Sequence, residues 1–163
     1  MLYFAFGSNM SIVRLQTRLP SARWVAVGSL TEHRLRFHKE SQDGSAKCDA
    51  EQTSDPEDKV IGVVYDIADD EKPILDRIEG LGSGYEIKKV EVTTDQGILT
   101  AFMYYATQTT PRFKPYRWYK QHVLVGAREN GLPPEYIAQI EAVEAIVDPD
   151  AERRKSELAI YDS

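Results

Sequence analysis

A short glycine-containing segment near the start of the chain joins an apolar run to a helix-like pattern. Phe6, Gly7, Ser8 and Asn9 form this junction. Such a junction points backbone N–H groups toward one spot, where the following helix adds its positive end, and glycine lets a ligand come close to the backbone. The pattern indicates a site for a small anion such as a carboxylate, although Gly-Ser-Asn is also a common turn sequence.

Two acidic residues, Asp76 and Glu79, are the next candidates. A spacing of three places both carboxylates on one face of a helix. Ile78 and Leu81 flank Glu79 with apolar bulk, and a carboxylate in such surroundings is suited to proton transfer. The competing interpretation is a solvated helix end with both side chains in water.

The aromatic residues between positions 114 and 135 allow three interpretations. The Tyr119 hydroxyl either bonds to backbone inside the core or faces a ligand. The pair Trp118 and Tyr119 beside Lys120 resembles a base-stacking patch, but the acidic balance of the chain favours core packing. A protein-interaction domain that exposes Tyr116, Trp118 and Tyr119 as an anchor is the third interpretation.

Other catalytic chemistries find little support. His33, His38 and His122 show no metal-ligand spacing with each other or with Cys48, so no metal is expected. Ser8 lacks the Gly-x-Ser-x-Gly pattern of a nucleophilic serine, and we expect Cys48 to be an inert thiol. No motif for a nucleotide or organic cofactor is present, and we expect none.

The composition of the chain limits the classes of partner that it can bind. The chain has 163 residues, which suits one domain, and its net charge of −6 disfavours nucleic acid as a partner. The single cysteine excludes an internal disulfide and fits a reducing compartment. No basic segment precedes the first apolar residues, and no apolar run approaches a membrane span. We therefore expect a cytoplasmic protein, with no membrane partner, that is a monomer or a homodimer.

The hydrophobic pattern places strands early and helices late. Alternation and β-branched residues predict strands at 3–6, 60–67, 86–94 and 98–106. They also predict one long or broken strand at 24–37, with a bulge or bend at 28–29. Periods of three and four predict helices at 11–19, 69–80, 116–131 and 133–146. We expect Ile74, Leu75 and Ile78 to face inward on the second helix. On the fourth helix we expect the inward residues to be Ile137, Ile140, Val143 and Ile146. The order predicts a single α+β domain with a mostly antiparallel or barrel-like sheet.

The end of the chain differs in composition from the rest. Residues 1–147 carry the strand and helix patterns, whereas residues 148–163 are strongly charged. Residues 151–160 have a helix-like pattern, and we expect this charged tail to be loosely attached to the domain.

Four segments in this order resemble the γ-glutamylcyclotransferase family, also called AIG2-like. Residues 3–10 (YFAFGSNM) are similar to the family signature Y-F-A-Y-G-S-N-L, and residues 60–65 (VIGVVY) to a V-x-G-V-V/L-W/Y strand. Residues 75–80 (LDRIEG) match L-D-x-x-E-G, and residues 126–136 are similar to G-A-K-E-N-G-L-P-x-E-Y. The resemblance covers most of the chain up to about residue 147.

The resemblance implies a small, mixed, mostly antiparallel barrel-like sheet surrounded by helices. It also implies that Glu79 is the catalytic acid–base. The residues expected to bind substrate are Tyr3, Phe4, Ala5, Phe6, Gly7, Ser8, Asn9 and Tyr119. Phe6 stands where many members of the family have tyrosine, and the segment 80–85 is richer in glycine than in some relatives; both departures lie near the expected site.

The implied reaction is a cyclotransferase reaction of glutathione metabolism, of lyase or acyl-transferase type. It converts a γ-glutamyl amino acid or γ-glutamyl amine to 5-oxoproline and a free amino acid or amine. The α-amino group of the substrate attacks its own γ-carbonyl, so the protein has to fold the substrate and move protons. A non-catalytic module of the same fold that binds small carboxylates is the alternative.

Overall fold

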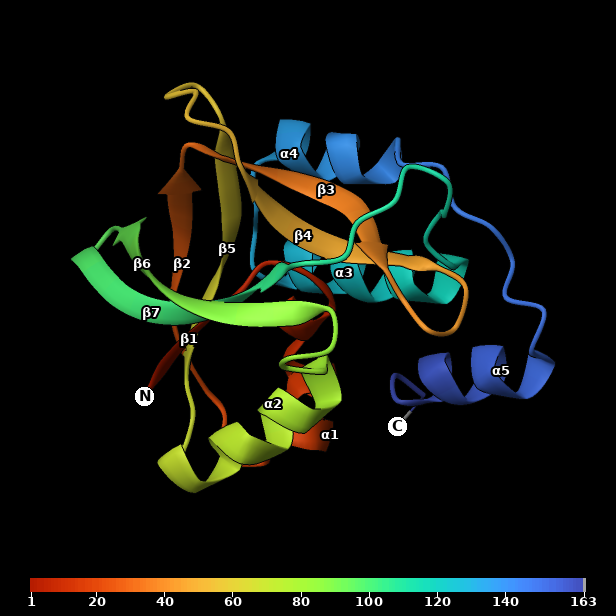
Figure 1. Ribbon diagram of the computed structural model, residues 1–163. Coiled ribbons are helices and arrows are strands. Elements are labelled where there is room, and N and C mark those ends of the chain that lie inside the picture. The colour runs from red at the N-terminus through yellow and green to blue at the C-terminus, as the bar shows by residue number, and fades with distance from the viewer. Residues whose placement is uncertain (163) are drawn as a thin grey trace.

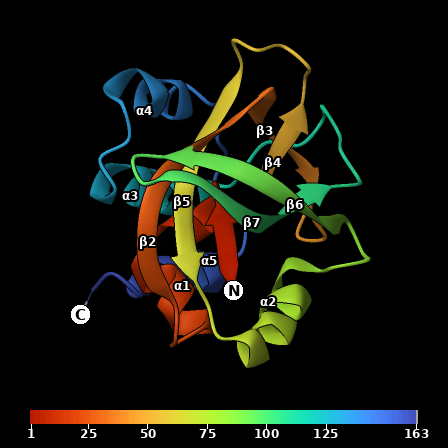
Figure 2. The ribbon, with the colours of Figure 1, turned by 90° about the vertical axis from the view of Figure 1, so that its left-hand side faces the viewer.

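The computed structural model describes residues 1–162, and its centre is a closed barrel of five strands (Figures 1 and 2). Around the barrel the order is β1, β5, β2, β6 and β7. All neighbours are antiparallel except β1 and β7, which close the barrel in parallel. The strands span Leu2–Ala5 (β1), Arg23–Thr31 (β2), Lys59–Asp66 (β5), Tyr85–Thr94 (β6) and Gly97–Ala106 (β7). The predicted α+β class and barrel-like sheet are therefore confirmed.

A separate two-stranded hairpin, β3 (His33–Glu40) and β4 (Ala46–Gln52), leaves the barrel after β2. The long or broken strand predicted at 24–37 is broken: it divides at Glu32, whose φ of 60° turns the chain. The bulge predicted at 28–29 is wrong, because the register of β2 shifts between Trp24 and Ala26 instead. At Gly28, a Cβ atom would lie 2.4 Å from Val92 Cγ1, so this glycine allows β2 to approach β6.

Five α-helices and two short 3₁₀ helices complete the fold. They span Ser8–Met10 (η1), Ile12–Arg18 (α1), Asp69–Glu71 (η2), Lys72–Glu79 (α2), Arg117–Glu129 (α3), Pro134–Glu141 (α4) and Ala151–Ala159 (α5). Figure 1 shows α1 and α2 below the barrel and α3 and α4 beside the hairpin. The Ser11 hydroxyl caps α1 by accepting the N–H of Arg14, and Gly80, at φ 75°, ends α2. Among residues 1–162, no helix is long and apolar enough to cross a membrane.

Two glycines set the spacing between the elements that carry the N-terminal loop. A Cβ on Gly62 of β5 would lie 2.4 Å from the carbonyl oxygen of Ala5, so β1 and β5 come unusually close. A Cβ on Gly126 of α3 would lie 2.5 Å from Met10 Cβ and 2.6 Å from the Ser11 nitrogen. The segment after β1 is therefore held between the barrel and α3.

Two residues expected to face inward do not. Ile78 of α2 is 42% exposed, because α2 buries only Leu75 fully and its next turn lies at the rim of the domain. Ile146, expected on the inner face of a helix reaching 146, is 39% exposed, because α4 already ends at Glu141. Glu79 thus lacks the apolar cover that Ile78 was expected to give.

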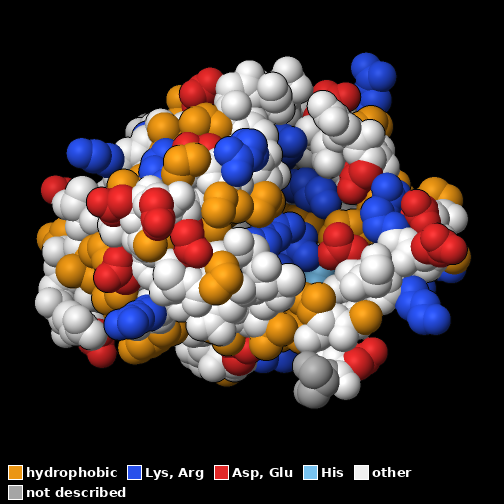
Figure 3. Space-filling view, turned by 90° about the horizontal axis from the view of Figure 1, so that it is seen from below, with side chains coloured by type: hydrophobic (Ala, Val, Ile, Leu, Met, Phe, Trp, Pro, Cys, Tyr) orange, Lys and Arg blue, Asp and Glu red, His pale blue; other side chains and the backbone are white. Residues whose placement is uncertain are grey.

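The charged tail forms a helix, α5, but it is not loosely attached. Glu157 of α5 accepts a hydrogen bond from Arg14 Nη1 at 2.7 Å and lies 3.1 Å from His122 Nε2. Tyr161 contacts His122 Nδ1 at 2.6 Å and donates to the Ser11 hydroxyl at 3.0 Å. Figure 3 shows Lys and Arg side chains gathered around a hollow on the underside.

Candidate active site

The segment that follows β1 presents unpaired backbone donors. Gly7 precedes the 3₁₀ helix η1, and the carbonyl oxygens of Gly7 and Ser8 accept hydrogen bonds from Met10 and Ser11. Among residues 1–162, the N–H groups of Gly7 and Ser8 have no hydrogen-bond acceptor. Two adjacent free N–H groups can bind one anionic oxygen. The expected junction of donors is therefore present, with a 3₁₀ turn inserted before α1.

Glu79 lies in the last turn of α2 and faces this segment. Its Oε1 atom accepts a hydrogen bond of 2.8 Å from Asn9 Nδ2, and the same nitrogen lies 3.1 Å from the Tyr3 hydroxyl oxygen. The Glu79 side chain is 18% exposed, so it is largely sheltered but still reachable from solvent. The alternative of a fully solvated helix end is thereby excluded for Glu79.

A partly buried cation, Arg18, lies next to this pair. Arg18 Nη1 donates to Asn9 Oδ1 at 3.3 Å and lies 3.9 Å from Glu79 Oε1. Burial and the nearby charge of Arg14 lower the pKa of Arg18, while the charge of Glu79 opposes that shift. Arginine nevertheless stays protonated in proteins, so Arg18 fixes the Asn9 amide in the orientation that points its nitrogen at Glu79.

Four tyrosines line the candidate site beside Glu79 and the segment after β1. The Tyr119 hydroxyl accepts the backbone N–H of Cys48 at 2.9 Å, and the Tyr85 hydroxyl donates to the Cys48 carbonyl at 2.6 Å. The Tyr104 hydroxyl donates to Asp76 at 2.6 Å, and the Tyr3 ring packs against the rings of Phe102 and Tyr104. Burial raises the pKa of Tyr3, Tyr85, Tyr104 and Tyr119, so all four hydroxyls remain neutral.

These groups enclose a small recess of about 30 Å³. This volume is about the share of one water molecule in the liquid, so the recess accepts one small group such as a carboxylate, with the rest of a ligand outside. Its lining consists of Tyr3, Phe4, Phe6, Gly7, Ser8, Asn9, Cys48, Glu79, Tyr85, Tyr104 and Tyr119.

The structure brings together most of the residues that the sequence singled out. Glu79, Tyr119 and the segment from Phe6 to Asn9 share the recess, and Tyr3 and Phe4 line it from β1. Ala5 does not line it; its side chain is buried in the core. Tyr116, Trp118 and Tyr119 are all at most 5% exposed, so the interpretation of these rings as an exposed protein-binding anchor is wrong.

Sequence reasoning missed Tyr85, Tyr104 and Arg18 and gave Cys48 no place in the site. Tyr85 and Tyr104 lie on β6 and β7, and only the closed barrel carries them beside β1. Burial raises the pKa of the Cys48 thiol to about 12, which agrees with an inert thiol whose backbone, rather than sulfur, serves the site. A signal for Arg18 was its position in the last turn of a helix adjoining the Gly-Ser-Asn segment.

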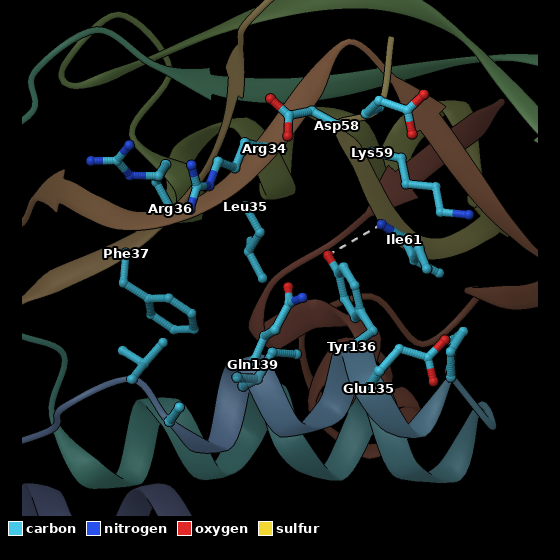
Figure 4. Close-up of a pocket in the computed structure, with 15 residues that line it drawn as sticks. Arg34, Leu35, Arg36, Phe37, Asp58, Lys59, Ile61, Glu135, Tyr136 and Gln139 are labelled. Carbon is cyan, nitrogen blue, oxygen red and sulfur yellow. Dashed lines mark hydrogen bonds between the residues drawn. The ribbon is translucent and has the colours of Figure 1, made fainter. Parts of the chain in front are cut away.

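A second and larger cavity of about 790 Å³ lies between β3 and α4 (Figure 4). Leu35 and Phe37 point toward α4, and the Tyr136 hydroxyl accepts the N–H of Ile61 at 3.1 Å. The charged side chains at its rim are of both signs, and none of the predicted site residues lines it. Within residues 1–162, no group of three His, Cys, Asp or Glu side chains could hold a metal ion. The small recess is therefore the candidate active site.

Comparison with known proteins agrees with the resemblance in sequence. A model of the AIG2-like family matches residues 59–140. The human protein named gamma-glutamylcyclotransferase is 33% identical over 153 residues, covering 88% of this chain and 78% of the relative. The mouse protein of the same name is 33% identical over 147 residues, with the same coverage of both chains.

The solved structures agree as well. A structure named gamma-glutamyl cyclotransferase superposes with a TM-score of 0.85 at 32% identity, covering 100% of this chain and 99% of the other. A human protein described as uncharacterized superposes with a TM-score of 0.79 at 35% identity, covering 89% and 88% of the two chains. With this fold, this extent of identity and the matching family model, the chain belongs to the AIG2-like, γ-glutamylcyclotransferase family.

Proposed function

We propose that this protein converts a γ-glutamyl amino acid or γ-glutamyl amine to 5-oxoproline and the free amino acid or amine. The α-nitrogen of the glutamyl group forms a bond to its own γ-carbonyl carbon, and the bond from that carbon to the leaving nitrogen breaks. Because the nucleophile is already attached to the electrophile, much of the proximity advantage comes with the substrate. The protein has to bend the chain and move two protons.

The observation that carries this proposal is the hydrogen bond between Asn9 and Glu79. It fixes a sheltered carboxylate beside Gly7 and Ser8, whose N–H groups have no acceptor among residues 1–162. One side of the recess thus offers a proton acceptor and the other offers donors for an anion. Intramolecular aminolysis of a γ-glutamyl group needs both.

The Glu79 carboxylate can both accept and donate the protons that the reaction moves. The α-ammonium of the substrate, protonated at neutral pH, gives a proton to Glu79 and becomes a nucleophilic amine. After the attack, the same carboxylic acid gives that proton to the departing nitrogen, which leaves as an amine. The regenerated carboxylate then removes the second proton from the ring nitrogen, which gives the neutral lactam, and this proton passes to the released amine. General acid–base help of this kind is worth about 10²–10⁴-fold in rate.

The backbone donors bind the anionic end of the substrate. The N–H groups of Gly7 and Ser8 receive the α-carboxylate of the glutamyl group, for which the recess has the right size. The neutral Tyr119 side chain forms the opposite wall and keeps the Cys48 backbone in place. The reaction requires no metal, nucleotide or organic cofactor, and a cytoplasmic location and a role in glutathione metabolism remain predictions.

Incubating the purified protein with a γ-glutamyl amino acid tests the proposal. We expect stoichiometric release of 5-oxoproline and free amino acid, measured by chromatography. Binding of the substrate without release of 5-oxoproline, from any of a panel of γ-glutamyl amino acids and amines, would instead establish a carboxylate-binding module of the same fold.

A further inference from the structure

Arg14 of α1 is a buried cation that the proposed reaction does not yet use. It is only 7% exposed, and its Nη1 atom donates to Glu157 of α5 at 2.7 Å and lies 3.0 Å from His122 Nε2. Burying an arginine costs free energy unless it is paired, and Glu157 supplies the opposite charge from 143 positions later in the chain. The Nε atom of the same guanidinium donates to the Ser8 hydroxyl at 3.2 Å. Arg14 therefore connects α5 to the segment after β1.

α1 holds that segment at two consecutive residues. Arg14 and Arg18 are four positions apart, which places both side chains on one side of the helix. Arg14 contacts the side chain of Ser8, and Arg18 contacts that of Asn9 at 3.3 Å. Asn9 donates to Glu79, whereas Ser8 carries one of the two N–H groups without an acceptor among residues 1–162. Arg18 thus acts on the residue that orients the carboxylate, and Arg14 acts on a residue that binds the anion.

The contact with Arg14 restrains a backbone that is otherwise held by a long hydrogen bond. The Ser8 carbonyl oxygen accepts the N–H of Ser11 at 3.3 Å. A donor that is already fixed in its binding orientation loses less conformational entropy when the anion arrives. A planar guanidinium suits this task, because it binds Ser8 through Nε and Glu157 through Nη1 in one fixed geometry. A lysine ammonium on a flexible stem keeps the charge but not that geometry.

We propose that Arg14 is a positioning residue for the N–H donors of Gly7 and Ser8, and that α5 fixes Arg14 through Glu157. The charged C-terminal helix thereby supports substrate binding. This inference rests on the proposed function of the same segment. Arg14 does not line the recess, so it acts through Ser8 and not on the substrate itself.

Kinetics of Arg14→Lys with γ-glutamyl-alanine test this role. We expect KM to rise about tenfold, the effect of losing one hydrogen bond to a charged group. We expect kcat to stay nearly unchanged, because Asn9 still orients Glu79. A loss of stability alone would act the other way, since it lowers the amount of active protein and leaves KM as it was. Arg117→Lys, at an exposed position of α3, is the matched control and should keep the wild-type KM.

A double-mutant cycle with Ser8→Ala identifies the route of the effect. Ser8→Ala removes the hydroxyl that Arg14 holds but keeps the backbone N–H, and we expect a similar rise in KM. Because both substitutions break the same contact, the double variant should have the KM of either single variant. Independent effects would instead multiply to about a hundredfold. Multiplied effects, or a wild-type KM in Arg14→Lys, would overturn the role of Arg14 and leave the cyclotransferase activity standing.

Glu157→Gln keeps the cycle informative if Arg14→Lys does not fold. Among residues 1–162, Glu157 shares no hydrogen bond with Ser8, whereas Arg14 bonds to both. We expect Glu157→Gln to raise KM, and we expect this rise to disappear when Ser8 is already alanine. An unchanged KM, or a rise that persists in the Ser8→Ala background, would overturn the role of α5.

The outcomes separate this role from the proposed function. If the wild-type protein releases 5-oxoproline from no γ-glutamyl compound, the proposed function fails. The same cycle is then measured as Kd for γ-glutamyl-alanine by calorimetry, where coupled losses of affinity support the role of Arg14 in anion binding. Equal Kd values in wild type and Arg14→Lys, or no binding by the wild type, would overturn it.

Discussion

The side-chain amide of Asn9 donates a hydrogen bond of 2.8 Å to the carboxylate of Glu79, which is 70 positions later in the chain. This contact joins the segment after β1 to the end of α2, two elements that the barrel brings together. Arg18 fixes the other end of the same amide at 3.3 Å. The orientation of the proposed acid–base therefore depends on one asparagine.

Replacing that asparagine should impair the reaction more than the fold. Asn9→Ala leaves Glu79 without its hydrogen-bond donor, and misplacement of a catalytic group by about 1 Å costs about 10²-fold in rate. We expect kcat for 5-oxoproline release to fall by about this factor, with the thermal midpoint changed by only a few degrees. A folded Asn9→Ala protein with wild-type kcat would show that Asn9 does not position Glu79. Thr17→Ala, exposed on α1, is a suitable control.

Substitution of Gly7 should act on substrate binding. A Cβ at this position would lie 3.0 Å from Cys48 Cβ and 3.3 Å from the Tyr119 hydroxyl, so it would crowd the recess. We expect Gly7→Ala to raise KM modestly and Gly7→Val to raise it at least about tenfold, the cost of losing a charge-assisted hydrogen bond. Steady-state kinetics on the two variants check this order. Unchanged substrate affinity in folded Gly7→Val would remove this segment from the binding site.

Gly126 should be needed for stability, because α3 touches the chain at Met10 and Ser11. Gly126→Ala introduces a methyl group where the nearest atoms are 2.5–2.6 Å away, partly backbone that cannot rotate aside. We expect a loss of about 1–3 kcal/mol in the free energy of unfolding, measured in urea. Gln121→Ala, on the exposed side of the same helix, should change it little. Equal effects of the two substitutions would contradict the close packing of α3.

The attachment of α5 should depend on pH. Burial opposes ionisation of Glu157, but hydrogen bonds from His122 and Arg14 outweigh it and hold the pKa of Glu157 at about 2, below its ordinary value of 4.5. A carboxylate with a depressed pKa in the folded state stabilises the protein above pH 4.5. That contribution is lost as the pH falls from 4.5 toward 2.

Glu157→Gln should therefore lower the free energy of unfolding by about 1–3 kcal/mol near pH 7, allowing for partial exposure of the side chain. The difference from wild type should narrow as the pH falls below 4.5. Thermal melts from pH 7 to pH 3.5 measure both quantities. A difference that stays constant over this range would mean that the charge of Glu157 does not hold α5. Glu152→Gln on the same helix is an exposed control.

Local patterns predicted the elements with strong periodicity. The apolar run of β5 becomes a strand with six consecutive buried residues, and Gly80 ends α2 in the left-handed conformation expected of it. β4 could not be recognised, because its sequence AKCDAEQ is polar. Its buried Asp49 carboxylate accepts a hydrogen bond from the N–H of Ala106 on β7, and this contact exists only after the barrel forms.

The candidate site was predictable only where a motif marked it. Gly7, Ser8 and Glu79 stood out by residue type, whereas their partners are set by the tertiary structure. Tyr85 and Tyr104 look like ordinary strand residues, and their hydroxyls reach the site because β6 and β7 pair in one particular register.

The most direct test concerns proton transfer by Glu79. Glu79→Gln keeps an oxygen that can accept the Asn9 hydrogen bond but removes the basic carboxylate. Asp76→Asn is the matched control on the same helix, since Asp76 pairs with Lys72 and Tyr104 and does not line the recess.

Single-turnover release of 5-oxoproline from a saturating γ-glutamyl amino acid is the decisive measurement. We predict that folded Glu79→Gln binds the substrate with nearly wild-type Kd and that its rate falls by about 10²–10⁴-fold, while Asp76→Asn loses far less. A Glu79→Gln protein that releases 5-oxoproline at the wild-type rate would contradict the account.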